Sequence, residues 1–252
     1  MTVASAADED PGRLAELSAN LTAVRAQIEQ ACAAAGRNPA EVALIAVTKT
    51  FPVPDIIRLA RLGVTDVGEN KDQEAAPKVA ECAAAGVSLS WHFIGQLQVN
   101  KVASVARYAD MVHSVDRNRL VTALSRRAGE NDRVIRCLVQ VSLDEDPAAP
   151  ESQGRAGRGG ADPGQVLGLC GQIAAADGLE LAGVMGVAPL GRPARPSYAR
   201  LREVAGTVRA RYPGARVISA GMSGDLREAI AEGATHVRIG TALLGGRQAL
   251  VR

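Results

Sequence analysis

The chain has 252 residues, of which 47% are hydrophobic, with 29 basic and 27 acidic side chains. This composition indicates a globular chain with a sizeable core, and a net charge of +2 without a basic stripe argues against nucleic-acid binding. We expect no membrane span and no secretion signal, because apolar runs are short and the N-terminus is acidic. The four cysteines form no C-x-x-C pair, which predicts reduced, mostly buried thiols in a cytoplasmic protein.

The N-terminal region predicts a tail followed by a helix. Residues 1–12 are acidic and contain Pro11, so we expect them to be disordered. From Arg13 to Ala35, apolar residues recur at three- and four-residue steps, and Gly36 follows. This pattern predicts an amphipathic helix ahead of the first strand.

Eight short β-rich runs follow, separated by helical stretches. They are residues 42–49, 64–69, 90–95, 111–116, 134–142, 181–188, 216–221 and 236–241. The alternation predicts a parallel sheet with helices outside, and eight such units in about 250 residues match a closed (β/α)8 TIM barrel. We therefore predict one TIM-barrel domain over residues 13–252, with the N-terminal helix beside a short last helix. A doubly wound open sheet is the alternative architecture.

The residues that follow the strands should meet at one mouth of the barrel, where TIM barrels carry their sites. Lys49 follows the first strand and Asn70 the second. The loops after the seventh and eighth strands carry glycines and hydroxyl groups: Gly221, Ser223, Gly224, Gly240 and Thr241. Glycine lets the backbone approach a ligand, so the pair of loops predicts a phosphate site. For either loop alone, an ordinary turn is the alternative.

Two cations are predicted at the same mouth. The alternation of Val237, Arg238 and Ile239 points Arg238 into the barrel, where it either faces a ligand or pairs with a carboxylate such as Glu69. Lys49 could simply extend to water. Beside another cation in a dry cavity, however, a lysine loses proton affinity, and its neutral amine forms a Schiff base with an aldehyde. A ligand with both a phosphate and an aldehyde, such as pyridoxal 5′-phosphate, fits this combination.

The sequence also carries a set of motifs over residues 42–247. They are "AVTKTFP", "GENKDQEA", "WHFIGQLQVNK", "HSVD", "GVMGVAP", "SAGMSGDLREAI" and "VRIGTALLGGR". In these motifs the chain resembles the pyridoxal phosphate homeostasis proteins, which share the fold of the N-terminal barrel of alanine racemase. The resemblance implies that Lys49 forms the internal aldimine with pyridoxal 5′-phosphate.

The resemblance also implies roles for the other residues at the mouth. The phosphate would be held by Ser223, Gly224, Gly240 and Thr241. Met222 would line the site, Asn70 would lie near the cofactor, and Arg238 would face the pyridine nitrogen. An arginine there keeps that nitrogen unprotonated, which weakens the ring as an electron sink.

By resemblance, the protein binds, buffers and delivers pyridoxal phosphate to apo-enzymes, and so affects amino-acid and keto-acid pools indirectly. A racemase of this fold needs a second acid–base group, a tyrosine from a C-terminal β-domain across a dimer, and the sequence shows no such domain. The three tyrosines, Tyr108, Tyr198 and Tyr212, are predicted on helices or at their ends, away from the strand ends. We therefore predict a monomeric, non-catalytic carrier. The alternatives are a weak amino-acid racemase, a phosphate-binding Schiff-base lyase, and a regulatory interaction protein.

Two segments depart from the family pattern. Gln96 and Val99 stand where the family often has Pro and Ser, and "GRAGRGG", residues 154–160, stands where it has a Lys-Ser-Gly stretch. No strand leads directly into residues 154–160, so we expect a flexible basic loop and not a nucleotide-binding loop. The histidines at 92, 113 and 236 lie on different predicted strands without ligand spacing, which predicts core or rim histidines and no metal.

Overall fold

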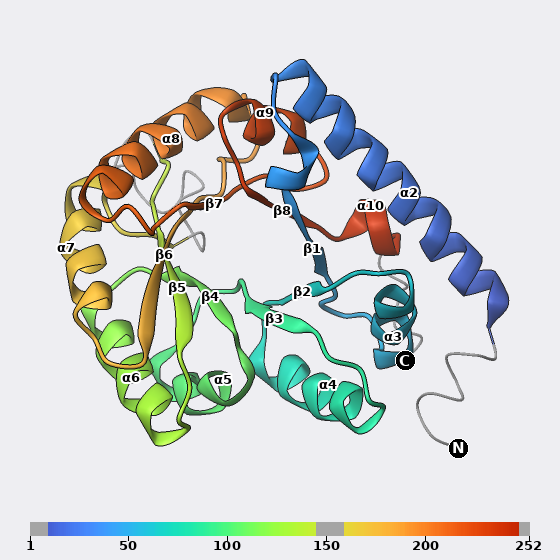
Figure 1. Ribbon diagram of the computed structural model, residues 1–252, viewed down its shortest axis with the longest axis horizontal. Helices are drawn as coiled ribbons and strands as arrows, with labels where there is room; N and C mark the ends of the chain where they lie inside the picture. Colours follow the sequence, from blue (N-terminus) through green and yellow to red (C-terminus); the bar gives the residue numbers. More distant parts are fainter. Residues whose placement is uncertain (1–9, 145–158, 247–252) are drawn as a thin grey trace.

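The computed structural model describes residues 10–144 and 159–246, which form a closed barrel of parallel strands surrounded by helices (Figure 1). The strands are hydrogen-bonded in sequence order, and β8 pairs with β1. They span Ala43–Val47 (β1), Asp66–Glu69 (β2), Ser90–Phe93 (β3), Met111–Val115 (β4), Ile135–Gln140 (β5), Leu179–Met185 (β6), Val217–Ser219 (β7) and His236–Ile239 (β8). Each predicted run overlaps one of these strands. The predicted TIM barrel is therefore confirmed, and the doubly wound alternative is wrong.

The helices lie on the outside of the barrel. They span Pro11–Ala34 (α2), Val53–Arg61 (α3), Asp72–Ala84 (α4), Val102–Tyr108 (α5), Asn118–Glu130 (α6), Pro163–Ala174 (α7), Ala194–Arg211 (α8), Leu226–Ala231 (α9) and Thr241–Leu244 (α10), with short 3-10 turns at Pro39–Glu41 and Val99–Lys101. Within residues 10–144 and 159–246, no helix combines the length and apolar character needed to cross a membrane.

Helix α2 begins two residues earlier than predicted. Proline suits the first helical turn, and the side chain of Asp10 accepts a hydrogen bond from the Arg13 N–H at 2.9 Å, so the helix starts at Pro11. The boundary of the predicted tail at residue 12 is thus too late, and residues 1–9 lie outside the described part of the chain.

The same helix covers the barrel beside the short α10, as predicted (Figure 1). Arg13 Nη2 donates to the Leu244 carbonyl at 2.9 Å, and Asn20 Nδ2 donates to the Leu243 carbonyl at 3.1 Å. These bonds satisfy carbonyl groups that the four-residue helix α10 leaves unpaired.

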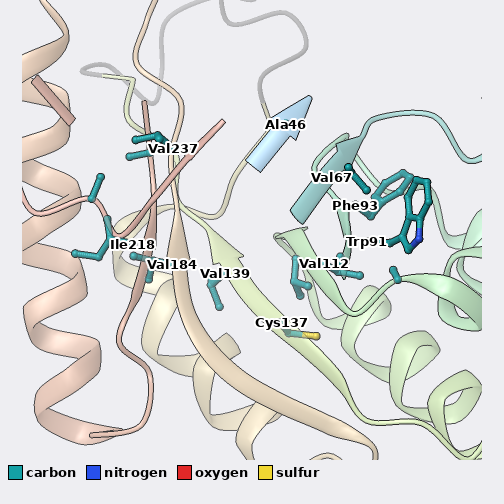
Figure 2. Close-up of a cluster of buried hydrophobic side chains, with 14 of the residues drawn as sticks. Ala46, Val67, Trp91, Phe93, Val112, Cys137, Val139, Val184, Ile218 and Val237 are labelled. Carbon is teal, nitrogen blue, oxygen red and sulfur yellow. The ribbon is translucent and has the colours of Figure 1, made fainter. Parts of the chain in front are cut away.

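Apolar side chains lie on both faces of the strands. Figure 2 shows the cluster between the strands and the helices, which includes Val67, Trp91, Val139 and Val237. A second, smaller apolar cluster is separate from it. Each of its residues is the sequence neighbour of a residue of the first cluster, so its side chain points to the opposite face of the strand. Its members are Met111, Leu138, Ala182, Met185 and Val217. All four cysteines are buried and free, as predicted.

Candidate functional site

Lys49 lies in the turn that follows β1, with a half-buried side chain. Its amine forms no hydrogen bond or ion pair with any residue of the described ranges. The next residue, Thr50, has a φ of 68°, a conformation that a β-branched side chain rarely adopts. The N–H of Thr50 donates to Glu74 Oε2 at 3.0 Å, and this bond holds the strained turn. Strain of this kind is common at functional sites.

A buried ion pair supports this turn from inside. Lys78, on α4, places its Nζ 2.7 Å from Glu69 Oε1 and 2.8 Å from the carbonyl of Thr48. The Thr48 hydroxyl donates to the same Glu69 oxygen at 2.8 Å. Burial raises the pKa of Glu69, and the ammonium of Lys78 opposes that shift. The residue immediately before Lys49 is therefore fixed through both its hydroxyl and its carbonyl group.

Arg238 points into the barrel, as the alternation predicted, and is only 4% exposed. Its Nη1 donates to Ser219 Oγ at 2.6 Å, and its Nη2 donates to the carbonyl of Gly186 at 3.1 Å. Burial lowers the pKa of Arg238 from its usual value. The alternative ion pair with Glu69 is wrong, because Glu69 is bonded to Lys78 and Thr48. No ion pair joins Arg238 to a carboxylate of residues 10–144 or 159–246.

The loops after β7 and β8 lie next to each other. The N–H of Ala242 donates to Ser223 Oγ at 3.4 Å, which links the two loops directly. Gly240 lies against the end of β1, since a Cβ built on it would be 3.5 Å from the carbonyl oxygen of Val47. Thr241 is exposed at the start of α10. The predicted phosphate residues are thus gathered near the strand that leads to Lys49.

The loop after β7 is held by a residue that the sequence analysis misplaced. Tyr198, on α8, donates its hydroxyl to Asp225 Oδ2 at 2.8 Å, and Asp225 Oδ1 accepts the N–H of Met222 at 2.6 Å. The prediction that Tyr198 lies away from the strand ends is therefore wrong. Burial, and then the neighbouring Asp225, raise the pKa of Tyr198, so its hydroxyl remains a neutral donor.

Asn70 is placed by a close approach of two strand ends. A Cβ on Gly95, after β3, would clash with the Asn70 carbonyl oxygen, so only glycine fits there. Asn70 lines a pocket of about 230 Å³ together with Phe93, Gln96, Lys101 and neighbouring residues. Lys49 is not part of that lining, so the predicted proximity of Asn70 to a ligand at Lys49 stays a prediction.

The comparisons with known proteins fit this geometry. The family described as "Alanine racemase, N-terminal domain" matches residues 19–248. A pyridoxal phosphate homeostasis protein of Mycobacterium bovis is 44% identical over 258 residues, covering 94% of this chain and 95% of the relative. The chain belongs to the pyridoxal phosphate homeostasis protein family. A relative of that name in Escherichia coli is 34% identical and covers 92% of this chain and 97% of its own.

A solved structure of this family gives the same fold. The PipY protein of Synechococcus elongatus, solved with PLP bound, superimposes with a TM-score of 0.78 at 32% identity. The match covers 91% of this chain and 100% of that one.

Two further predictions concern metal binding and the basic loop. Within the described ranges, no group of three or more His, Cys, Asp or Glu side chains is arranged to hold a metal ion. The predicted basic loop spans residues 154–160, and its residues 154–158 lie outside the described part of the chain. Gly159 is described, and a Cβ on it would lie 3.2 Å from Gln96 Nε2, so the end of that segment meets the loop after β3.

Proposed function

We propose that the protein binds pyridoxal 5′-phosphate through a Schiff base with Lys49 and acts as a carrier that buffers the cofactor and delivers it to apo-enzymes. The observation that carries this proposal is the Lys49 amine, which lies at the end of β1 without a partner in the described ranges. Family membership and the PLP-bound PipY structure support the choice of ligand. The bound cofactor would supply an aldehyde for the lysine, and the protein would supply position and charge.

The glycines near Lys49 fit a phosphate group. Neither Gly224 nor Gly240 has a positive φ, so backbone conformation does not require glycine at either position. A Cβ on Gly224 would meet nothing within 4 Å, and one on Gly240 would make only ordinary contact. An open cradle that a side chain could fill is what a ligand approaching the backbone needs. The hydroxyl groups of Ser223 and Thr241 would add hydrogen bonds to the phosphate.

The charge at the other end of the site also fits. A guanidinium donates hydrogen bonds and keeps its protons in proteins, so Arg238 can hold a ring nitrogen only in its unprotonated form. An unprotonated pyridine is a weak electron sink.

The positions of the tyrosines support a carrier more than a racemase. The chain has three tyrosines, and Tyr198 already donates its hydroxyl to Asp225. Tyr108 lies on α5 with a buried hydroxyl, and Tyr212 follows the end of α8. The bonded hydroxyl of Tyr198 and the buried hydroxyl of Tyr108 support a carrier, because a racemase needs a free acid–base group opposite Lys49, and such a group contributes roughly 10²–10⁴-fold in rate. We propose that the carrier is a monomer.

The test is a labelling experiment. The labelled residue can be assigned unambiguously, because the chain contains only four lysines, at 49, 71, 78 and 101. Purified protein is loaded with pyridoxal phosphate, reduced with borohydride and mapped by peptide mass spectrometry. The pyridoxyl group should appear on Lys49 in the wild type and in the matched Lys101→Ala variant, and it should be absent from Lys49→Ala.

Two results would contradict the proposal. A single adduct that persists in Lys49→Ala would place the anchor on another lysine, and racemisation of alanine at enzyme-like rates would exclude a non-catalytic carrier. Delivery is tested by mixing loaded protein with an apo-aminotransferase, whose activity should return. The monomeric state is tested separately by analytical sedimentation.

A further inference from the structure

A continuous chain of polar side chains crosses the interior of the barrel and ends at Arg238. Ser219 Oγ accepts from Arg238 at 2.6 Å and lies 3.0 Å from Nδ1 of His113. Nε2 of His113 is 2.9 Å from Nδ1 of His92. Nε2 of His92 is 2.9 Å from Oδ1 of Asp66, at the start of β2. The links come from β8, β7, β4, β3 and β2.

The carboxylate at one end of the hydrogen-bond chain fixes the direction of every bond when both rings are neutral. The Asp66 carboxylate only accepts, so a neutral His92 carries its proton on Nε2 and leaves Nδ1 bare. A neutral His113 then carries its proton on Nε2, donates to Nδ1 of His92, and accepts at Nδ1 from the Ser219 hydroxyl. Ser219 Oγ in turn accepts from Arg238, which can only donate. Ser90 Oγ lies 3.2 Å from Nε2 of His92 and can accept from the same N–H beside Asp66.

The surroundings favour a neutral His113 and an ionised Asp66. His113 is faced by His92 from β3, by Arg238 and His236 from β8, and by Arg136 from β5. Burial, and then these neighbours, hold the pKa of His113 well below its usual value. Burial raises the pKa of Asp66, but hydrogen bonds from His92 and Thr65 outweigh it and lower the pKa. Asp66 also lines a cavity of about 280 Å³ at the opposite end of the barrel from Lys49, so its charge can be hydrated.

We propose that this is a hydrogen-bond chain of one fixed direction, which positions the guanidinium of Arg238, and that Ser219 and His113 are positioning residues. The role toward a cofactor rests on the proposed function, because Arg238 would face the ring nitrogen. The direction of the chain does not rest on it. The guanidinium of Arg238 donates to two acceptors, Ser219 Oγ and the Gly186 carbonyl. The bond to Ser219 fixes the orientation of the guanidinium plane on the Nη1 side.

The first test uses cofactor-free protein and ¹⁵N NMR of the histidine rings. The protein has only three histidines, so single His→Gln variants assign the signals. Neutral rings protonated on Nε2 are expected for both His92 and His113. A doubly protonated His92, or an Nδ1-protonated His113, would mean that the bonds run the other way and would overturn the proposal.

The second test compares two buried serines. Ser219→Ala breaks the chain, whereas Ser114→Ala on β4 removes a hydroxyl that is buried and has no partner in the described ranges. Ser219→Ala should weaken binding of pyridoxal phosphate roughly tenfold. It should also shift the pH at which the absorbance of the bound cofactor changes, and Ser114→Ala should change neither property.

The outcomes separate the two proposals. Equal behaviour of the two variants would overturn the positioning role. If the wild type takes up no pyridoxal phosphate, the proposed function fails together with the role of Arg238 toward the cofactor, whereas the NMR result still decides the direction of the chain.

Discussion

The buried pair of Lys78 and Glu69 gives a sharp prediction about the turn that carries Lys49. The Lys78→Met variant removes the ammonium but keeps a side chain of similar length. It leaves the Glu69 carboxylate buried, with the Thr48 hydroxyl as its remaining donor. It also leaves the Thr48 carbonyl without the Lys78 donor.

Breaking a buried ion pair in this way costs about 3–5 kcal/mol of unfolding free energy, because an uncompensated charge remains. The double variant, Lys78→Met with Glu69→Leu, removes both charges and should lose less than either single variant. We expect an interaction energy of roughly 2–3 kcal/mol from the double-mutant cycle.

The pH dependence of Lys78→Met has a definite sign. Without the ammonium, burial raises the pKa of Glu69 further above its usual value near 4.5, so the folded state binds the proton more tightly than the unfolded state. Stability is then lost as the pH rises through that raised pKa. The variant should therefore be closer to the wild type at about pH 5 than at about pH 8.

The assay is urea unfolding followed by fluorescence of Trp91, the single tryptophan of the chain, which is buried. The matched control is Lys71→Met, which breaks an exposed pair with Glu74 and should cost less than about 1 kcal/mol. Equal losses for Lys78→Met and Lys71→Met would refute the reasoning.

Three further perturbations test other parts of the structure. Burial, and then His92, lower the pKa of His236 to about 4 from about 6.5 in the unfolded chain. The unfolded state therefore takes up the proton first, and urea titrations should show a loss of roughly 2 kcal/mol at about pH 5, which His236→Gln reduces. Gly95→Ala should cost roughly 1–3 kcal/mol because its Cβ would meet backbone, whereas Gly129→Ala, with open space on α6, should gain about 0.5–1 kcal/mol in the same assay. Tyr198→Phe should cost roughly 1 kcal/mol and speed the loss of bound cofactor; unchanged retention would show that its hydrogen bond does not hold the loop after β7.

The architecture was predictable because its signals are local. Strands buried on both faces appear as short apolar runs, and the helices between them have their own period. Period two within β8 placed Arg238 inside the barrel, and its burial confirms this. The start of α2 depended on a side-chain cap at Asp10, which lies at the edge of a segment whose composition suggested disorder.

The partners of the inward polar groups were harder to predict, because they come from elements far apart in the sequence. Lys78 pairs with Glu69, the carboxylate that was considered as the partner of Arg238. The sequence did indicate that Lys78 is buried, since it shares one face of α4 with the buried residues Ala75 and Cys82. His92 lies between the outward apolar residues Trp91 and Phe93, and His113 follows Val112, so period two also placed both rings inward. What the sequence could not supply was the barrel register that brings these two rings within hydrogen-bond distance.

Solvent exposure increases from one end of the candidate site to the other, and this difference affects how a carrier would exchange its cofactor. Arg238 is 4% exposed and fixed by the polar chain, whereas Met222, in the loop after β7, is 36% exposed. On the proposed function, the ring would meet a fixed buried charge, and the phosphate would lie among surface loops. Surface loops open at a lower free-energy cost than barrel strands. Cofactor could therefore be exchanged from the phosphate end while the barrel stays closed, and the arginine would keep the ring a weak electron sink throughout.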